Sequence, residues 1–99
     1  MTPDTGVATS VRADVWLWRA RFFRTRALSC AHVRKSGLRL SHAGQTRRTD
    51  KPGAGLAVGD IVTFGQGADI LSVEVLDLGT RRGPVEEART LYRPLESEP

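Results

Sequence analysis

The sequence has little cysteine, no long apolar run and no recognisable leader, and each shortage excludes a class of protein. Cys30 is the only cysteine, so no disulfide can form within the chain. No run of about 18 apolar residues exists, which excludes a membrane-spanning helix. The opening MTPDTGVATS lacks the basic and apolar regions of a signal peptide, so we expect a cytoplasmic protein.

Charge is divided unevenly along the chain, although the formal net charge is only +4. Residues 12–51 carry 11 Lys/Arg and two acids, a local net of +9, whereas the rest carries four bases and nine acids, a net of −5. Lysine supplies only two of the 15 bases, and arginine binds phosphate through a planar bidentate fork that lysine lacks. The pattern favours one cationic face that attracts a polyanion, with an ordinary solvated basic surface as the alternative.

The first half of the chain predicts two helices in one domain. The first helix begins at Asp14, its candidate cap, and runs to about Phe23. Thr25, after a link of about two residues, is a good N-cap for a second helix that ends at the candidate C-cap Gly37. The apolar stripe of the first helix contains Val15, Trp18 and Phe22.

The second half predicts strands. Leu38 and Leu40 alternate with polar residues in a short strand, and residues 43–59 are expected to be mostly turns. Residues 60–64 and 70–78 predict two longer strands that pair antiparallel. Pro84 then opens a short terminal helix. The order of elements indicates a small α+β domain.

The stretch RADVWLWRARFFRTRAL, residues 12–28, resembles the opening of the RNA-binding domain first defined in ribosomal small-subunit protein four, the S-four domain or αL motif. The WLW and ARFFRTRAL segments, with RRGPVEEARTLY at residues 81–92, look like the ribosome-associated heat-shock protein fifteen family of bacteria. One departure concerns the first hairpin, where the family has Asn-Gly and this chain has His42-Ala43-Gly44 with one extra residue. We therefore expect that loop to contact RNA differently. The residues that fit the S-four signature are Arg12, Asp14, Thr25, Arg26 and Gly37.

The resemblance implies an S-four fold, with two N-terminal helices packed on a small antiparallel sheet and a short C-terminal helix. It implies a flexible tail at 1–10, the RNA-binding domain at 11–80, and a C-terminal helix and tail at 81–99. It also implies a non-enzymatic heat-shock protein that binds ribosomal RNA of the large subunit, and tRNA, while stalled subunits carrying nascent chain-tRNA are recycled. We expect a monomer with no cofactor and no membrane partner.

Ten residues are candidate RNA contacts, most of them around the start of the second helix. A helix N-terminus offers backbone donors and a positive dipole end to a phosphate. Trp16, at the edge of the apolar stripe, is a candidate for base stacking, with core packing as the alternative, whereas Trp18 is expected in the core. For Arg21 the alternative is an ion pair with Asp14 or a C-terminal acid. The ten are Arg12, Trp16, Arg21, Arg24, Thr25, Arg26, Lys35, Arg39, Arg47 and Arg48.

Other chemistry has little support in the sequence. Cys30, His32 and His42 lack the spacing of metal ligands, and Cys30 and His32 point to different sides of a helix, so they do not form a nucleophilic pair. Glu86 and Glu87 are helix neighbours that do not converge as a catalytic pair would. Two alternatives to RNA binding stay open: a helix-turn-helix-like DNA-binding module, and a basic interaction module for an acidic protein.

Overall fold

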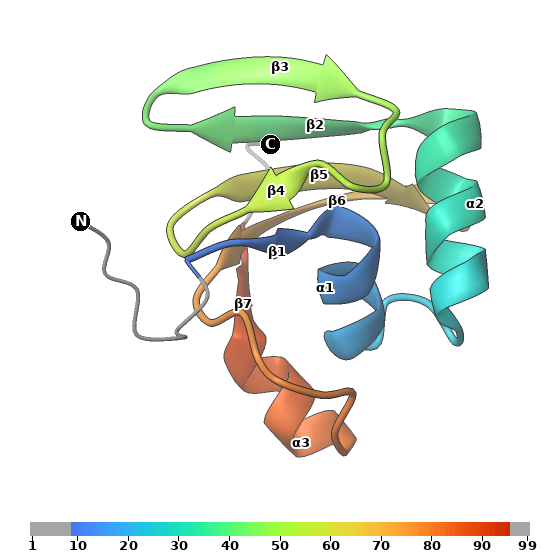
Figure 1. Cartoon of the computed structure of the whole chain (residues 1–99), viewed down its shortest axis with the longest axis vertical. Coiled ribbons are helices and arrows are strands. Elements are labelled where there is room, and N and C mark those ends of the chain that lie inside the picture. Colours follow the sequence, from blue (N-terminus) through green and yellow to red (C-terminus); the bar gives the residue numbers. More distant parts are fainter. Residues whose placement is uncertain (1–8, 96–99) are drawn as a thin grey trace.

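A five-stranded antiparallel sheet in the order β3-β2-β5-β6-β7 is the frame of the structure, a computed structural model that describes residues 9–95 (Figure 1). The predicted α+β class of fold is confirmed, with two N-terminal helices, an antiparallel sheet and a short C-terminal helix. The parts of the predicted tails at 1–8 and 96–99 lie outside the described residues. The strands of the main sheet are β2 (Leu38–His42), β3 (Gln45–Thr49), β5 (Ile61–Gln66), β6 (Asp69–Val75) and β7 (Tyr92–Pro94).

The remaining elements surround this sheet. Strands β1 (Val11–Arg12) and β4 (Gly55–Leu56) form a second, two-stranded sheet. The helices are α1 (Ala13–Arg19), α2 (Arg26–Ser36) and α3 (Val85–Ala88), which continues as the 3-10 turn η1 (Arg89–Leu91). No helix within residues 9–95 is long and apolar enough to cross a bilayer.

Trp16 lies at the centre of the core. Its side chain is fully buried, and its indole Nε1 donates a hydrogen bond to the backbone oxygen of Asp77 at 2.9 Å. Phe22 packs against it with ring centroids 6.2 Å apart and also contacts Phe64 at 4.9 Å and Tyr92 at 4.7 Å. Aromatic side chains from α1, the following loop, β5 and β7 thus meet on one side of the sheet. The sheet contributes Leu38, Leu40, Val62, Phe64, Val73 and Val75 to this core.

The first predicted helix is too long, and of its predicted apolar stripe Val15 is buried and Phe22 packs on the core, whereas Trp18 is only half-buried. It begins one residue before Asp14, which makes no cap, and it ends at Arg19 instead of Phe23. Arg21 has a φ of 68°, a left-handed conformation that ends helical hydrogen bonding. The release of the chain there lets Phe22 reach across to the sheet. The link to α2 is therefore six residues long, 20–25, instead of about two.

The second predicted helix is confirmed at both ends. The Thr25 hydroxyl accepts a hydrogen bond from the backbone N–H of Leu28 at 3.1 Å, as an N-cap does. Gly37 follows the last helical residue with a φ of 74°, which glycine adopts without steric strain. This turn directs the chain at once into β2, which is also as predicted.

The prediction of turns at 43–59 was wrong for β3 and β4. Strand β3 pairs with β2 along its whole length, from His42 opposite Gln45 to Leu38 opposite Thr49. Its sequence QTRRT has no apolar residue and lies at the edge of the sheet, so it carries no alternating hydrophobic signal.

The C-terminal segment docks on the domain. The predicted pair of longer strands is confirmed as β5 and β6, although β6 ends at Val75 instead of at residue 78. The backbone N–H groups of Leu76 and Asp77 both donate to the oxygen of Leu91, and β7 then pairs with β6. The terminal helix is shorter than predicted, and Leu91 is buried while Val85 is half exposed. The domain boundary at residue 80 stays a prediction.

Trp16→Ala should lower the free energy of unfolding by about 3–5 kcal/mol, because a large buried ring leaves a cavity. Trp18→Ala, at a half-buried position, should cost only about 1 kcal/mol. Urea unfolding followed by circular dichroism measures both. A larger loss of unfolding free energy for Trp18→Ala than for Trp16→Ala would contradict this assignment and support the apolar stripe predicted from the sequence.

The β2–β3 turn generates a second prediction. Its two residues, Ala43 and Gly44, have φ of 51° and 82°, a geometry that favours Asn-Gly. Ala43→Asn should therefore stabilise the protein by about 0.5–1 kcal/mol. Ala68→Asn is the matched control, because Ala68 lies in the β5–β6 turn without a positive φ. An equal thermal shift in both variants would show that turn geometry is not the cause.

Candidate nucleic-acid interface

The start of α2 presents exposed groups that bind anions. Arg24, Thr25 and Arg26 are all exposed, and Thr25 holds the first turn of the helix through its cap. Within residues 9–95, no ion pair includes Arg24 or Arg26. Both guanidinium groups are therefore available to an incoming phosphate.

Arg12 is only partly available. Its Nε and Nη2 donate to the two carboxylate oxygens of Asp14, each at 3.0 Å. The hydrogen bonds that Arg12 donates to Asp14, and then the charge of Asp14, raise the pKa of Arg12 above its ordinary value. The Asp14 side chain is almost fully buried while the Arg12 side chain stays 54% exposed. The predicted partnership of Asp14 with Arg21 is thus replaced by one with Arg12.

Asp14 also connects three elements through its backbone. Its oxygen accepts a hydrogen bond from the Ser29 hydroxyl of α2 at 2.9 Å, and its N–H donates to the oxygen of Pro52 at 3.1 Å. The residue that was expected to cap α1 therefore holds α1, α2 and the β3–β4 loop together, and it positions Arg12 beside them.

Arg21 lies away from the start of α2. Its Nε donates to the backbone oxygen of Gly83 at 2.6 Å, so the side chain reaches the segment before α3. Its surroundings are Phe22, Arg82, Val85 and Arg89. The sequence placed Arg21 among the RNA contacts with an acid as the alternative partner. In the structure its Nε anchors the C-terminal segment through a carbonyl, no acid pairs with it within residues 9–95, and its contact with RNA stays a prediction.

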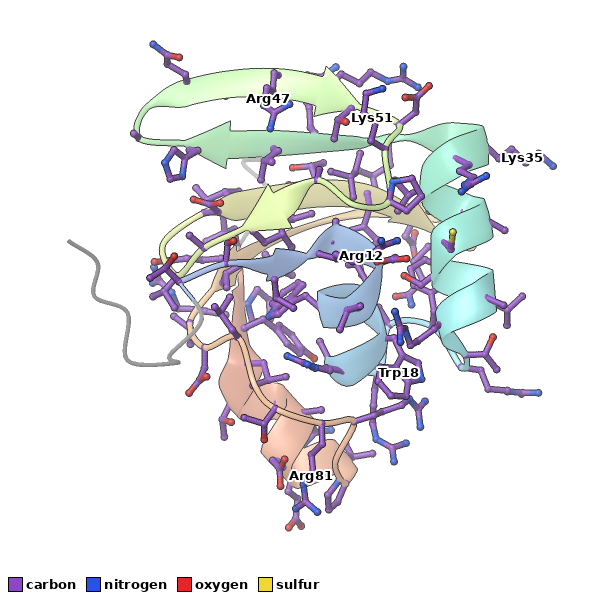
Figure 2. All side chains as sticks on the ribbon, in the orientation of Figure 1. Arg12, Trp18, Lys35, Arg47, Lys51 and Arg81 are labelled. Atoms are coloured by element: carbon purple, nitrogen blue, oxygen red, sulfur yellow. The ribbon has the colours of Figure 1, made fainter. Side chains whose placement is uncertain are left out.

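The two tryptophans exchange their predicted roles. Trp16 has no exposed surface, so the prediction that it stacks on a base was wrong. Trp18 is half-buried and lies between α1 and the start of α2 in Figure 2. The sequence missed this because the short α1 turns Trp16 and Leu17 toward the sheet. Trp18 is therefore the tryptophan that a base can reach.

One flank of α2 carries an arginine stripe. Arg26, Cys30 and Arg34 recur at four-residue spacing, which places them on one side of the helix. Ser29, the neighbour of Cys30, donates to the backbone oxygen of Asp14, the residue that also binds the Arg12 guanidinium. Arg34 was not among the predicted contacts, although its spacing from Arg26 could have identified it. Lys35 was predicted and projects from another side of α2 (Figure 2).

Strand alternation divides the remaining predicted arginines between two faces. Arg47 lies opposite Leu40, a core residue, and so belongs to the helix-covered face of the sheet. Arg48 lies opposite Arg39, and both point to the other face. The helix-side basic surface therefore consists of Arg12, Arg26, Arg34, Arg47 and Lys51. Figure 2 shows three of these residues, Arg47, Lys51 and Arg12, far from Arg81 beyond α3.

Two of the C-terminal arginines, Arg81 and Arg93, are ion-paired with acids. Arg81 forms a two-bond ion pair with Glu87, with distances of 3.1 and 2.6 Å. The hydrogen bond from Arg81 lowers the pKa of Glu87 and raises that of Arg81. Arg93 pairs with Glu74. Acids thus offset part of the positive charge near α3 and β7, whereas no ion pair within residues 9–95 includes an arginine of α2 or of the β2–β3 hairpin.

No cluster of three or more metal-binding side chains occurs among the residues described. His42 is paired through Nδ1 with the buried Asp60 carboxylate at 2.5 Å, and Asp60 also accepts from the N–H of Ala57. Cys30 and His32 lie on α2, apart from this pair. The His42–Asp60 pair ties the β2–β3 hairpin to the start of β5.

The chain is similar in sequence and in structure to heat shock protein 15 of other bacteria. The heat shock protein 15 homolog of Aeromonas salmonicida is 35% identical over 89 residues, 90% of this chain and 64% of that protein. Heat shock protein 15 of Escherichia coli K12 is 36% identical over 85 residues, 86% and 60% respectively. A trimeric structure of Vibrio cholerae heat shock protein 15 matches with a TM-score of 0.74 at 32% identity, over 87% of this chain and 82% of that one. This chain thus spans less than two thirds of the two curated relatives, and no protein-family model matches it.

The division between anchored and free arginines generates a prediction. Arg12→Gln should lower the midpoint of urea unfolding, because it leaves the Asp14 carboxylate buried without its ion partner. Arg26→Gln is the matched control and should leave the midpoint unchanged, since no ion pair within residues 9–95 involves it. Equal midpoints for the two variants would contradict the structural role of Arg12.

Proposed function

The chain belongs to the heat shock protein 15 family, which has the S-four fold, and from that premise we propose that it is a non-catalytic RNA-binding protein of the large ribosomal subunit. Its expected partner is ribosomal RNA, with tRNA as a further contact. The proposed setting is heat stress, in which stalled large subunits that carry nascent chain-tRNA are recycled. The membership in a heat-shock family supports this setting.

The observation that carries the proposal is the helix-side basic surface. Its residues lie along α2, beside α1 and on the β2–β3 hairpin with the loop after it, and only Arg12 among them has an acidic partner within the described residues. A surface of one sign of charge attracts an anionic ligand. At the start of α2, which Thr25 caps, the free backbone N–H groups and the positive end of the helix dipole also attract an anion.

The residues suggest how RNA would be held. Arg26 and Arg34 lie about two turns apart on α2. Each can bind a phosphate through two parallel hydrogen bonds. Arg47 and Lys51 extend the contact toward the β2–β3 hairpin. Trp18 offers a ring for an unpaired base. Such a surface reads the backbone geometry and shape of RNA more than its sequence, because phosphate contacts carry no base information.

The two alternatives have weaker support. A helix-turn-helix DNA reader needs base-reading side chains on its second helix, and the exposed side of α2 lacks asparagine and glutamine. An acidic protein partner would meet the same arginines, but treatment of a pull-down with nuclease separates the two cases. Complex that survives complete removal of RNA would favour the protein partner.

Binding to a structured large-subunit RNA should weaken steeply with salt. Four to six phosphate contacts give a slope of log affinity against log salt of about −3 to −5. The double variant Arg26→Gln/Arg34→Gln should lower affinity about tenfold and flatten the slope by about 1.5, with no change in melting temperature. Arg81→Gln/Arg89→Gln is the control, because it removes the same charge near α3. Fluorescence anisotropy measures both quantities, and a flat salt response of the wild type would refute the proposal.

The oligomeric state of this chain is predicted to be monomeric. The Vibrio cholerae relative is described as trimeric, and that assembly belongs to that protein. We propose that this chain binds RNA as a monomer, since the helix-side basic surface is built from one copy. Light scattering coupled to size exclusion, with and without RNA, determines the mass of the binding species.

A further inference from the structure

The face of the main sheet that no helix covers within residues 9–95, called here the uncovered face, carries its own cationic row. Strand register places Arg48 of β3 opposite Arg39 of β2, Arg39 opposite Thr63 of β5, and Thr63 opposite Ser72 of β6. These four side chains point away from the core, because Leu38, Leu40, Val62 and Val73 occupy the alternate positions. The row therefore lies on the opposite side of the sheet from the helix-side basic surface.

The two arginines of this row carry like charges on directly opposite positions of paired strands. Residues directly opposite on antiparallel strands have Cβ atoms about 4.5–5.5 Å apart, and like charges there are destabilising. No ion pair in the part of the chain that the structure describes includes Arg39 or Arg48. Within residues 9–95, the fold thus brings two guanidinium groups together without an ion-paired carboxylate.

Arg48 is held in place by the end of α2. Its Nη2 donates to the backbone oxygen of Ser36 at 2.8 Å. Gly37 leaves room for this group, since a Cβ at Gly37 would lie 3.0 Å from Nη2. The guanidinium is therefore oriented before any ligand arrives, which reduces the entropy lost on binding.

A shallow hollow adjoins the two arginines. It has a volume of about 190 Å³, and Arg39, Arg48, Thr63 and Ile70 line it together with the turn at Ser36–Gly37. The Ile70 side chain is 75% exposed and gives the hollow an apolar edge. Next to it the hydroxyls of Thr63 and Ser72 are 2.7 Å apart. Guanidinium and hydroxyl groups beside an apolar edge match a phosphate joined to a sugar and base.

We propose that Arg39 and Arg48 form a phosphate clamp on the uncovered sheet face, a second RNA-binding surface that acts independently of the helix-side one. The ligand class is the phosphodiester backbone of RNA, with one phosphate bridged by both guanidinium groups and its nucleoside against Ile70. The proposal rests on the proposed function, because it takes RNA as the ligand. It adds that the protein contacts RNA from two opposite faces.

The test uses the full chain and a fluorescein-labelled hairpin of large-subunit ribosomal RNA. Arg39→Gln/Arg48→Gln should weaken binding about tenfold and flatten the salt slope by about 1.5, because two phosphate contacts are lost. Arg81→Gln/Arg89→Gln, with the same net charge, should bind like the wild type. Equal affinity and slope for these two double variants would overturn the clamp.

Thr63→Glu gives an independent readout that loss of folding cannot imitate. A glutamate at this position lies directly opposite Arg39, so it should form a cross-strand ion pair and hold or raise the melting temperature. The same carboxylate should repel phosphate and weaken RNA binding about fivefold or more. Binding at the wild-type level would overturn the clamp.

The outcomes separate this inference from the proposed function. If Arg26→Gln/Arg34→Gln loses RNA while Arg39→Gln/Arg48→Gln keeps it, only the clamp fails. A wild type that binds no RNA at low salt overturns both. If Arg39→Gln/Arg48→Gln binds RNA normally but no longer sediments with large subunits, the face meets a protein, and the RNA clamp is again refuted.

Discussion

The buried indole of Trp16 is the contact on which the rest of the structure depends. It fills the space between α1 and the sheet, and its single polar atom is satisfied by the oxygen of Asp77. That hydrogen bond connects the first helix with the segment that leads to α3, 61 residues later. Phe22 completes the cluster only because the chain leaves the helix at Arg21. The packing of the core, the position at which α1 ends and the docking of the C-terminal segment thus depend on one another.

This core also determines where positive charge is free. Arg21 and Arg19 donate to carbonyl oxygens of the C-terminal segment, so they act as structural anchors. Arg12 is tied to Asp14, which is itself held by Ser29 of α2. The acids of the second half neutralise their own neighbours near α3 and β7. Within residues 9–95, most of the exposed arginines without an acidic partner lie on α2, on the loop before it and on the β2–β3 hairpin, while Arg89 in η1 is a further one.

The hairpin distributes its charge to both sides because a strand alternates. Arg47 and Arg48 are neighbours in sequence, yet they lie on opposite faces of the sheet. A thin domain with one helix-covered face and one open face can therefore present cations in two directions. An RNA-binding protein of this size can use both without a second domain.

The sequence alone determined the class of fold, the start and end of α2, the β5–β6 hairpin and the concentration of charge in residues 12–51. These follow from local rules: caps, glycine conformations, alternation and simple counting. It did not determine which tryptophan is buried, because that depends on where α1 stops, and α1 stops where packing of Phe22 on the sheet requires it. It missed β3 because an edge strand of polar residues has no hydrophobic period. Which arginines are free was decided only by tertiary structure, since their partners Asp14, Gly83 and Glu87 are selected by folding and not by sequence distance.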